Sequence, residues 1–435
     1  MQNKGFASSS EYWVKFGWGV LIGMLTALSV LFFNYLMNLG LKLLWPGQPA
    51  IEPFSGSWQI VIILTAAGFI VGLIYHFMEA KEVGVVEILT QDRVDIRPIP
   101  GGLLISLVSL IGGFSVGPEV PSAMIGAWLA TKISDARKLS DEIRKSNMIS
   151  SLTAAYGGLF TSPFGAILIP IEVPHVQSIA FVGTMIIATA ASVIGFALFY
   201  FTGGDEFAGL LRILDLPMYD LQIWHLPIAV VLGILGAGLA VIFVLSMGTL
   251  KRLVVSLNHR PILRNTLAGF LLGLLGFALP MTLFLGSDGL VLVTDNAAEI
   301  GVTLLIVYVF AKILATAGAI STGFIGGPIF PLFFVGGTMG TAVTLLFPDI
   351  PIALSVGCLM VAVTAGVLPI PISLGIYVIL IVGLPITEAI PVLIAALTSF
   401  LVIKGFGLLS PSKKPAAKKN YKDDGDGDTN TKTIK

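Results

Sequence analysis

The sequence is poor in charge, in cysteine and in histidine, and each shortage excludes a class of protein. Charged residues make up 11% of the 435 positions, whereas a soluble domain carries about 25%. The single cysteine, Cys358, excludes a disulfide scaffold and a cysteine metal cluster. The four histidines are scattered without metal-ligand spacing, so we expect no metal and no other cofactor. The formal net charge is zero, so bulk charge identifies no partner, and no nucleic acid is expected.

Catalytic motifs are also missing from the sequence. It contains no serine or metalloprotease motif, no paired intramembrane aspartates and no carboxylate cluster for a pyrophosphate substrate. We therefore do not expect an enzyme. A transporter, a channel and a non-transporting membrane receptor or scaffold stay open.

Apolar sequence, in contrast, is abundant. Hydrophobic residues make up 55% of the chain, and the mean hydropathy is +0.94. Long apolar runs lie near or above the roughly 20 residues that span a bilayer, which predicts an all-α polytopic protein of the cell (inner or plasma) membrane. The first run is too long for the apolar part of a cleavable signal peptide, so none is expected. The runs cover residues 16–45, 57–78, 178–202, 223–250, 265–285, 301–320 and 391–403.

The distribution of Lys and Arg predicts how the chain is oriented in the bilayer. Basic residues gather in the loops 131–146 and 251–264 and in the C-terminal tail, and such loops face the cytoplasm. The segments 203–222 and 286–299 are acidic and are expected outside. Both termini are then cytoplasmic.

The chain also contains an internal repeat. The segment 67–73 echoes the segment 268–274, and the Gly/Pro-rich break before Pro121 echoes the break before Pro331. Echoes in the same order at similar offsets predict two homologous halves. The predicted organisation is a cytoplasmic N-terminus (1–15), a first membrane repeat (16–205), an exterior linker (206–221), a second membrane repeat (222–406) and a disordered cytoplasmic tail (407–435).

One acid lies deep in apolar sequence. Glu119 is the only acidic residue between Asp95 and Asp135. A carboxylate at membrane depth costs several kcal/mol unless it has partners or a function. The flanking Gly and Pro residues break the helix, and such backbone is tolerated in a membrane only where it lines a cavity or is buried in protein. We therefore predict a re-entrant pair of segments with Glu119 at the tip.

A second break, over residues 326–331, lies at the corresponding place in the other half. Paired interrupted helices indicate a substrate site near the midplane. Helices that begin at residues 119 and 329 would direct free N–H groups and their positive dipole ends at this site, which favours an anion. We therefore predict anion transport, with Glu119 as a tethered competitor for the site. The alternative for Glu119 is a buried structural acid held by helix-start amides.

These segments resemble the CLC family of chloride channels and chloride/proton antiporters. Gly112-Gly-Phe-Ser-Val-Gly-Pro-Glu-Val-Pro121 is similar to the G-x-E-x-P segment of the family, Gly326-Gly-Pro-Ile-Phe-Pro331 is similar to its G-x-F-x-P segment, and residues 154–172 are similar to the helix pair that follows the gate. The resemblance implies that Glu119 is the external gate. It also implies an inverted-repeat fold of about eighteen helices per subunit, of the prokaryotic type without CBS domains, and a homodimer with one pore per subunit.

Several positions depart from the family pattern around the central anion site. Val83 stands where the family has an anion-binding serine, and Pro118 and Pro328 remove backbone N–H groups beside the site. The site that the resemblance implies is lined by Val83, Gly117, Val120, Gly327, Ile329 and Phe330.

Other departures concern the pore tyrosine and the path of protons. The pore tyrosine of the family aligns near Pro385, and Tyr377 lies too early in the sequence to replace it. The inner proton-accepting glutamate aligns with Val173, so Glu172 beside it is at most a displaced proton relay. Lys312, in an apolar run, either attracts anions or is a snorkelling or intersubunit lysine.

A passive, gated pathway for chloride or another small anion is therefore the favoured function. The first alternative is a proton-coupled anion antiporter that uses Glu119 and, in addition, Glu172. The second is a non-transporting receptor or scaffold in the lipid bilayer.

Overall fold

The computed structural model describes residues 9–45, 47, 51–173, 179–208 and 214–407. Over these residues the chain forms sixteen α-helices and two short 3₁₀ helices, with no strand, which confirms the predicted all-α class. The first half contains α1 (Ser10–Leu44), α2 (Trp58–Phe77), α3 (Val85–Thr90), α4 (Ile99–Ile111), α5 (Glu119–Ala136), α6 (Asp141–Leu159), α7 (Pro163–Glu172) and α8 (Ile179–Ala208). The second contains α9 (His225–Val254), η2 (Val255–Leu257), α10 (Pro261–Ala278), η3 (Pro280–Thr282), α11 (Ser287–Asp295), α12 (Ala297–Thr322), α13 (Ile329–Leu346), α14 (Ile352–Val367), α15 (Pro371–Val382) and α16 (Ile386–Gly405).

Eight helices of the described part of the chain are long and apolar enough to cross a bilayer. Each of the apolar runs read from the sequence contains or overlaps one of them, and α13 is a further one that those runs omitted. Other apolar helices, such as α4 with 13 residues and α14 with 16, are shorter than the roughly 20 residues of a full span. The chain is therefore a multi-pass membrane protein that mixes complete spans with partial ones.

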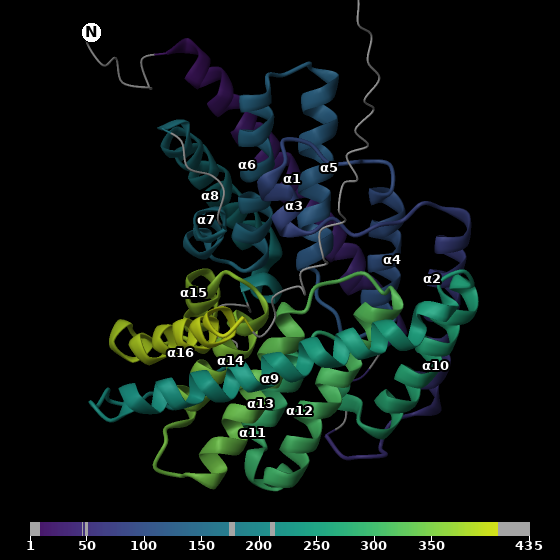
Figure 1. The fold of residues 1–435 in the computed structure, drawn as a ribbon, viewed down its shortest axis with the longest axis vertical. Coiled ribbons are helices and arrows are strands. Elements are labelled where there is room, and N and C mark those ends of the chain that lie inside the picture. The colour runs from purple at the N-terminus through teal and green to yellow at the C-terminus, as the bar shows by residue number, and fades with distance from the viewer. Residues whose placement is uncertain (1–8, 46, 48–50, 174–178, 209–213, 408–435) are drawn as a thin grey trace, which may run out of the picture.

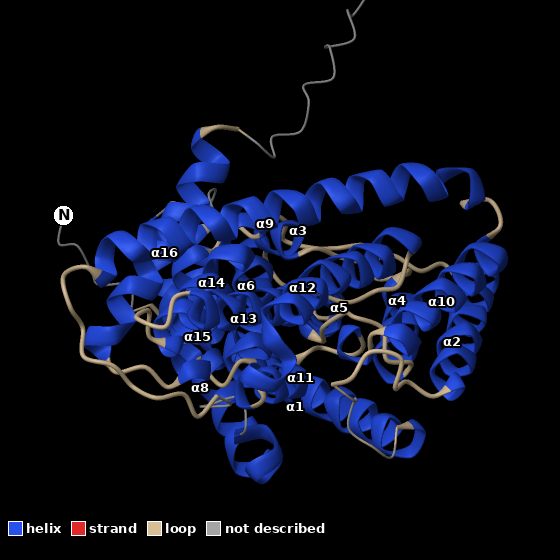
Figure 2. Ribbon diagram, turned by 90° about the horizontal axis from the view of Figure 1, so that it is seen from below, coloured by secondary structure: helices blue, strands red, loops and turns tan. Residues whose placement is uncertain are grey.

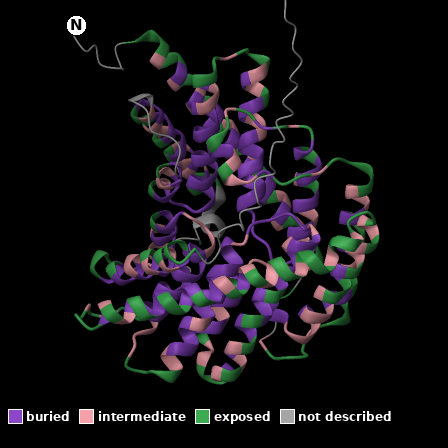
Figure 3. Ribbon diagram, in the orientation of Figure 1, coloured by how far each residue is buried: buried purple, intermediate pink, exposed green. Residues whose placement is uncertain are grey.

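In Figure 1 the helices of the first half, α1 to α8, lie mostly above those of the second half, α9 to α16. Buried positions, purple in Figure 3, gather where the helices face one another, and exposed positions lie on the outer sides. The helix α14 is the clearest core element, because its residues from Ala353 to Gly366 are all buried. A helix that is apolar on every side in this way belongs inside a bundle.

The two echoing segments pack against each other, as the neighbouring positions of α2 and α10 at the right of Figure 1 show. A Cβ atom added to Gly68 of α2 would lie 2.3 Å from the carbonyl oxygen of Asn265, and one added to Gly269 of α10 would lie 2.3 Å from that of Leu64. Small residues allow helix backbones in membranes to touch. The glycines therefore bring α2 and α10 into direct backbone contact.

Two interruptions of the backbone set the geometry of the centre. After α4 the chain turns through Gly113, whose φ is +84°, and α12 ends at Gly323, whose φ is +98°. Residues with a side chain rarely adopt this left-handed conformation. The next helices begin at Glu119 and Ile329, directly after a proline at each N-cap, and both starts agree with the prediction.

Candidate functional site

The loops before α5 and α13 meet inside the protein. The N–H of Gly117 donates to the carbonyl oxygen of Gly327 at 2.7 Å, and the N–H of Gly327 donates to that of Gly117 at 2.8 Å. This pair forms the one isolated antiparallel bridge of the described residues. The structure thus brings together the two breaks that the sequence predicts to face each other.

The side chain of Glu119 lies across this bridge and is 1% exposed. Its Oε1 accepts a hydrogen bond of 2.6 Å from the backbone N–H of Ile329, the first residue of α13. Its Oε2 has no hydrogen-bond partner among the described residues. The carboxylate therefore occupies the N-terminus of α13, where the unpaired N–H groups and the helix dipole favour negative charge.

Gly327 leaves the room that this carboxylate needs. A Cβ atom at position 327 would lie 2.1 Å from Oε1 of Glu119, a distance that no side chain tolerates. Gly117 is equally close to the carboxylate, because its Cβ would lie 2.0 Å from Oε2. The glycines on both sides of the bridge thus shape the place that the Glu119 carboxylate fills.

The remaining predicted lining residues are also buried. Val120 is the second residue of α5, and Ile329 and Phe330 are the first two residues of α13. Val120 and Ile329 are 9% and 4% exposed, and Phe330 is 5% exposed. Val83 is buried immediately before α3 and belongs to the same continuous apolar core. No polar side chain occupies position 83, so the valine offers no hydrogen bond there.

A stack of aromatic rings extends from Phe330 into the first half of the chain. The ring of Phe330 stacks on that of Phe160 with centroids 5.4 Å apart, and Phe160 stacks on Tyr377 at 4.2 Å. Tyr156 contacts Phe160 edge-on at 5.5 Å. Tyr377, which lies too early in the sequence to align with the pore tyrosine of the family, is connected to Phe330 through the ring of Phe160.

The hydroxyl of Tyr377 is a buried polar group that nothing in the sequence predicts near Phe330. Tyr377 is 1% exposed, and its Oη has no hydrogen-bond partner among the described residues. A buried hydroxyl without a partner costs free energy, so such a group calls for an explanation.

Glu172, the candidate proton relay, accepts hydrogen bonds from the start of another helix. Its Oε1 accepts from the N–H of Ile372 at 2.6 Å, and its Oε2 accepts from the N–H of Ser373 at 2.8 Å and from the Ser373 hydroxyl. These are the free N–H groups at the start of α15. The geometry therefore favours a structural role, in which Glu172 joins α7 to α15.

Lys312 is fully buried, so the interpretation as a snorkelling or intersubunit lysine is wrong for this structure. Its Nζ donates to the carbonyl oxygens of Leu283 at 2.7 Å, Phe284 at 2.9 Å and Thr282 at 3.2 Å, and it lies 5.0 Å from the centroid of the Phe334 ring. The lysine holds the loop before α11 against α12 because the carbonyls supply the polar partners that its ammonium group needs in the core.

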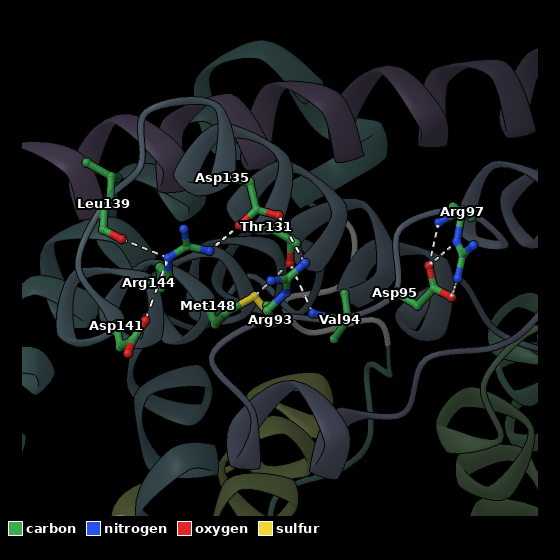
Figure 4. A network of polar contacts seen from close by, with 10 residues as sticks. All are labelled: Arg93, Val94, Asp95, Arg97, Thr131, Asp135, Leu139, Asp141, Arg144 and Met148. Atoms are coloured by element: carbon green, nitrogen blue, oxygen red, sulfur yellow. Dashed lines mark hydrogen bonds and ion pairs between the residues drawn. The ribbon is translucent and has the colours of Figure 1, made fainter.

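Polar contacts at the far end of α5 fix the helix that carries Glu119 (Figure 4). Arg144 and Arg93 both form ion pairs with Asp135, and the distance from Arg93 to Asp135 is 3.6 Å. The hydroxyl of Thr131 accepts the N–H of Val94 at 3.3 Å. The network joins α5 to α6 and to the segment before α4, so the position of the Glu119 end is set from outside the site. No cluster of three potential metal ligands occurs among the described residues.

The family model described as voltage gated chloride channel matches residues 66–404, most of the chain. The chain belongs to the CLC family. Members of the CLC family are transporters and channels rather than enzymes, and they carry anions across membranes.

Similar CLC proteins were found among curated sequences and solved structures. The chain is 28% identical over 407 residues to "Putative ion-transport protein YfeO" of Escherichia coli (strain SMS-3-5 / SECEC), with 89% of this chain and 92% of that protein covered. Two crystal structures share the fold at lower identity. One is a slow cyanobacterial Cl⁻/H⁺ antiporter (TM-score 0.72, 19% identity, 90% of this chain and 95% of that one covered), and the other is a CLC-type fluoride/proton antiporter (TM-score 0.73, 18%, 90% and 96%).

Proposed function

We propose that this protein transports a small inorganic anion, chloride or fluoride, across the plasma membrane through a pathway that Glu119 gates. The observation that carries the proposal is the hydrogen bond from the N–H of Ile329 to the Glu119 carboxylate. The N-terminus of a helix is an anion site, and a tethered anion already fills it here. An incoming anion therefore binds there only when the Glu119 side chain leaves.

Exchange of the anion for protons is the mode that we propose. Protonation of Glu119 removes the negative charge that attracts it to the N-terminus of α13, and a neutral carboxyl competes less well with an anion. Proton binding to Glu119 and anion binding at the N-terminus of α13 are then coupled, because both displace the charged carboxylate from the same place. The two solved relatives are proton antiporters by title, for chloride and for fluoride, and this supports the same mode here.

A passive anion pathway, favoured by the sequence alone, is the second candidate. The geometry of Glu172 supports it, because three donors hold this carboxylate at the start of α15. An acid held in this way is poorly suited to pass protons onward. Without an inner acid, Glu119 would open the pathway for the anion but would not couple anion movement to proton movement.

Flux from liposomes separates the two candidates. Purified protein is reconstituted with chloride, fluoride or nitrate inside, and a pH gradient is imposed without an anion gradient. Uphill movement of an anion, lost in Glu119→Gln, supports proton exchange. Downhill flux alone supports the passive pathway. If no anion of the panel moves, both candidates are wrong.

The homodimer with one pore per subunit, and the cytoplasmic position of both termini, are further parts of this proposal. They follow from the family resemblance and from the basic loops. Cys358 is buried, so a cysteine introduced in place of exposed Lys138 can be labelled selectively. Labelling from the cytoplasmic side alone would support the orientation, and cross-linking of detergent-solubilised protein tests the dimer.

A further inference from the structure

A cavity of about 270 Å³ lies between α9, α10 and α12, away from the site of Glu119. Leucines dominate its lining, and Leu267, Leu271 and Leu314 are each more than 40% exposed on the outer surface of the protein. Figure 2 shows α9 and α10 joined by a turn at the edge of the molecule, so the cavity adjoins one end of this hairpin. Its apolar walls face the region that lipid chains occupy.

Arg264 is the one charged residue in the lining of this cavity. Its Nη1 donates to Oδ1 of Asn258 at 2.9 Å and its Nε donates to Oδ1 of Asn265 at 3.1 Å, while its guanidinium group lies 5.4 Å from the centroid of the Tyr75 ring. All three partners are neutral. No ion pair with a carboxylate is found for Arg264 in the described part of the chain. A partly buried cation without a counter-ion is costly, so the geometry calls for an anion from outside the protein.

The charges around Arg264 are mostly basic, and the one acid in this region, Glu82, interacts with Tyr75 and Lys251 without forming an ion pair with Arg264. Lys251 and Arg252 lie in the last turn of α9 and Arg260 directly precedes α10, and all three are exposed. The sequence from 251 to 264 contains no acid. Basic pockets between transmembrane helices attract the head groups of anionic lipids. A leucine-lined cavity that ends at a guanidinium group matches a molecule with an apolar chain and an anionic head.

We propose that this cavity binds an anionic phospholipid, with one acyl chain along the leucines and its phosphate on Arg264. The planar guanidinium group donates two parallel hydrogen bonds to a phosphate. Such a pair supplies the counter-ion that the protein itself does not provide. A zwitterionic phospholipid fits the leucines equally well, but its positive head group meets four basic residues.

The lipid site is connected to the centre of the protein. Tyr75, on which Arg264 lies, donates from its hydroxyl to the carbonyl oxygen of Gly323 at 2.8 Å. Gly323 ends α12 with a φ of +98°, and the loop that follows leads to Gly327. A phosphate on Arg264 fixes the guanidinium over Tyr75, and thereby steadies the end of α12 from which this loop departs.

Native mass spectrometry of the purified full chain tests the binding. Delipidated protein is titrated with phosphatidylglycerol and with phosphatidylcholine of identical acyl chains. The wild type should retain phosphatidylglycerol preferentially, and Arg264→Gln should lower that affinity by about tenfold, the loss of one charged hydrogen-bonded pair. Arg252→Gln removes a nearby charge at the end of α9 that does not line the cavity, and it should have a smaller effect.

A second variant tests the cavity without altering the arginine. Leu271→Trp fills the space for the acyl chain and should reduce binding of phosphatidylglycerol, whereas Leu263→Trp, at an exposed position of α10 outside the cavity, should not. Equal binding of the two lipids by the wild type, or unchanged binding by Leu271→Trp, would overturn the proposal. The same holds if folded Arg264→Gln keeps the full preference.

Discussion

The first backbone N–H of α13, that of Ile329, is bound by the carboxylate of Glu119, 210 residues earlier in the chain. The bond joins the two halves of the sequence at the point where both interrupt a helix. It places a titratable group where a transported anion would bind. The predictions that follow test this arrangement and the residues around it.

Glu119→Gln keeps the size of the side chain and removes its negative charge. The neutral amide competes less well for the N-terminus of α13, so anion affinity should rise and the pH dependence of flux should disappear. Liposome flux between pH 4.5 and 7.5 and calorimetric anion titration measure the two effects. Asp141→Asn, at an exposed side chain, is the control for a lost carboxylate. A pH profile identical to that of the wild type would refute the gate.

Gly327→Ala places a methyl group where the Glu119 carboxylate lies. The carboxylate must move away from Ile329, so the gate should open or the loop should distort, with a destabilisation of about 1–3 kcal/mol. Gly238→Ala is the matched control, because no atom lies within 4 Å of its new Cβ. We expect the control to be neutral or slightly stabilising in thermal unfolding. Comparable behaviour of the two variants would argue against close packing at Gly327.

Tyr377→Phe removes only a hydroxyl and keeps the stacked ring. If the hydroxyl serves the transported anion, as we expect, anion affinity falls by about tenfold or less while stability without anion is unchanged or higher. Tyr308→Phe is the contrasting variant, since the Tyr308 hydroxyl donates to the carbonyl oxygen of Ile51 at 2.6 Å. It should lose stability and keep its affinity. Titration calorimetry and thermal unfolding distinguish these patterns.

Lys312→Met should destabilise the protein by about 3 kcal/mol or more, because it leaves several buried carbonyl groups without a donor. Lys132→Met, at an exposed position, should have little effect. Thermal unfolding in detergent measures both variants. Normal stability of Lys312→Met would mean that the loop before α11 finds other donors.

Glu172→Gln tests whether the acid at the start of α15 is structural. A glutamine offers a single acceptor oxygen in place of the two carboxylate oxygens of Glu172. The free energy of unfolding should therefore fall by about 1 kcal/mol, as for the loss of other helix caps. The ratio of protons to anions moved should not change. A lost or altered ratio with normal stability would instead assign Glu172 to the proton path.

Local signals were sufficient to predict the breaks and the starts of their helices. Pro118 and Pro328 precede the helix starts, and the glycines before them prevent a continuous helix, so both features can be read from neighbouring residues. Glu119 stands out because charge is rare in the apolar sequence around it. These predictions needed no knowledge of distant contacts.

Tertiary contacts decided the rest. Tyr377 reaches the aromatic stack through the packing of α15 against α7, which spacing along the chain does not encode. Lys312 points at carbonyls of a loop about thirty positions earlier, and the sequence around it gives no sign of this partner. Glu172 finds its donors on another helix about two hundred positions later. Each is a contact between elements that become neighbours only in the fold.

The contact of α2 with α10 through Gly68 and Gly269 limits how this protein can move ions. Two helices whose backbones touch have no layer of side chains between them to slide or repack, so large rocking of one against the other would break many close contacts at once. The transport cycle is therefore expected to run on small displacements: one carboxylate swinging between a helix end and open space, with the scaffold standing still around it.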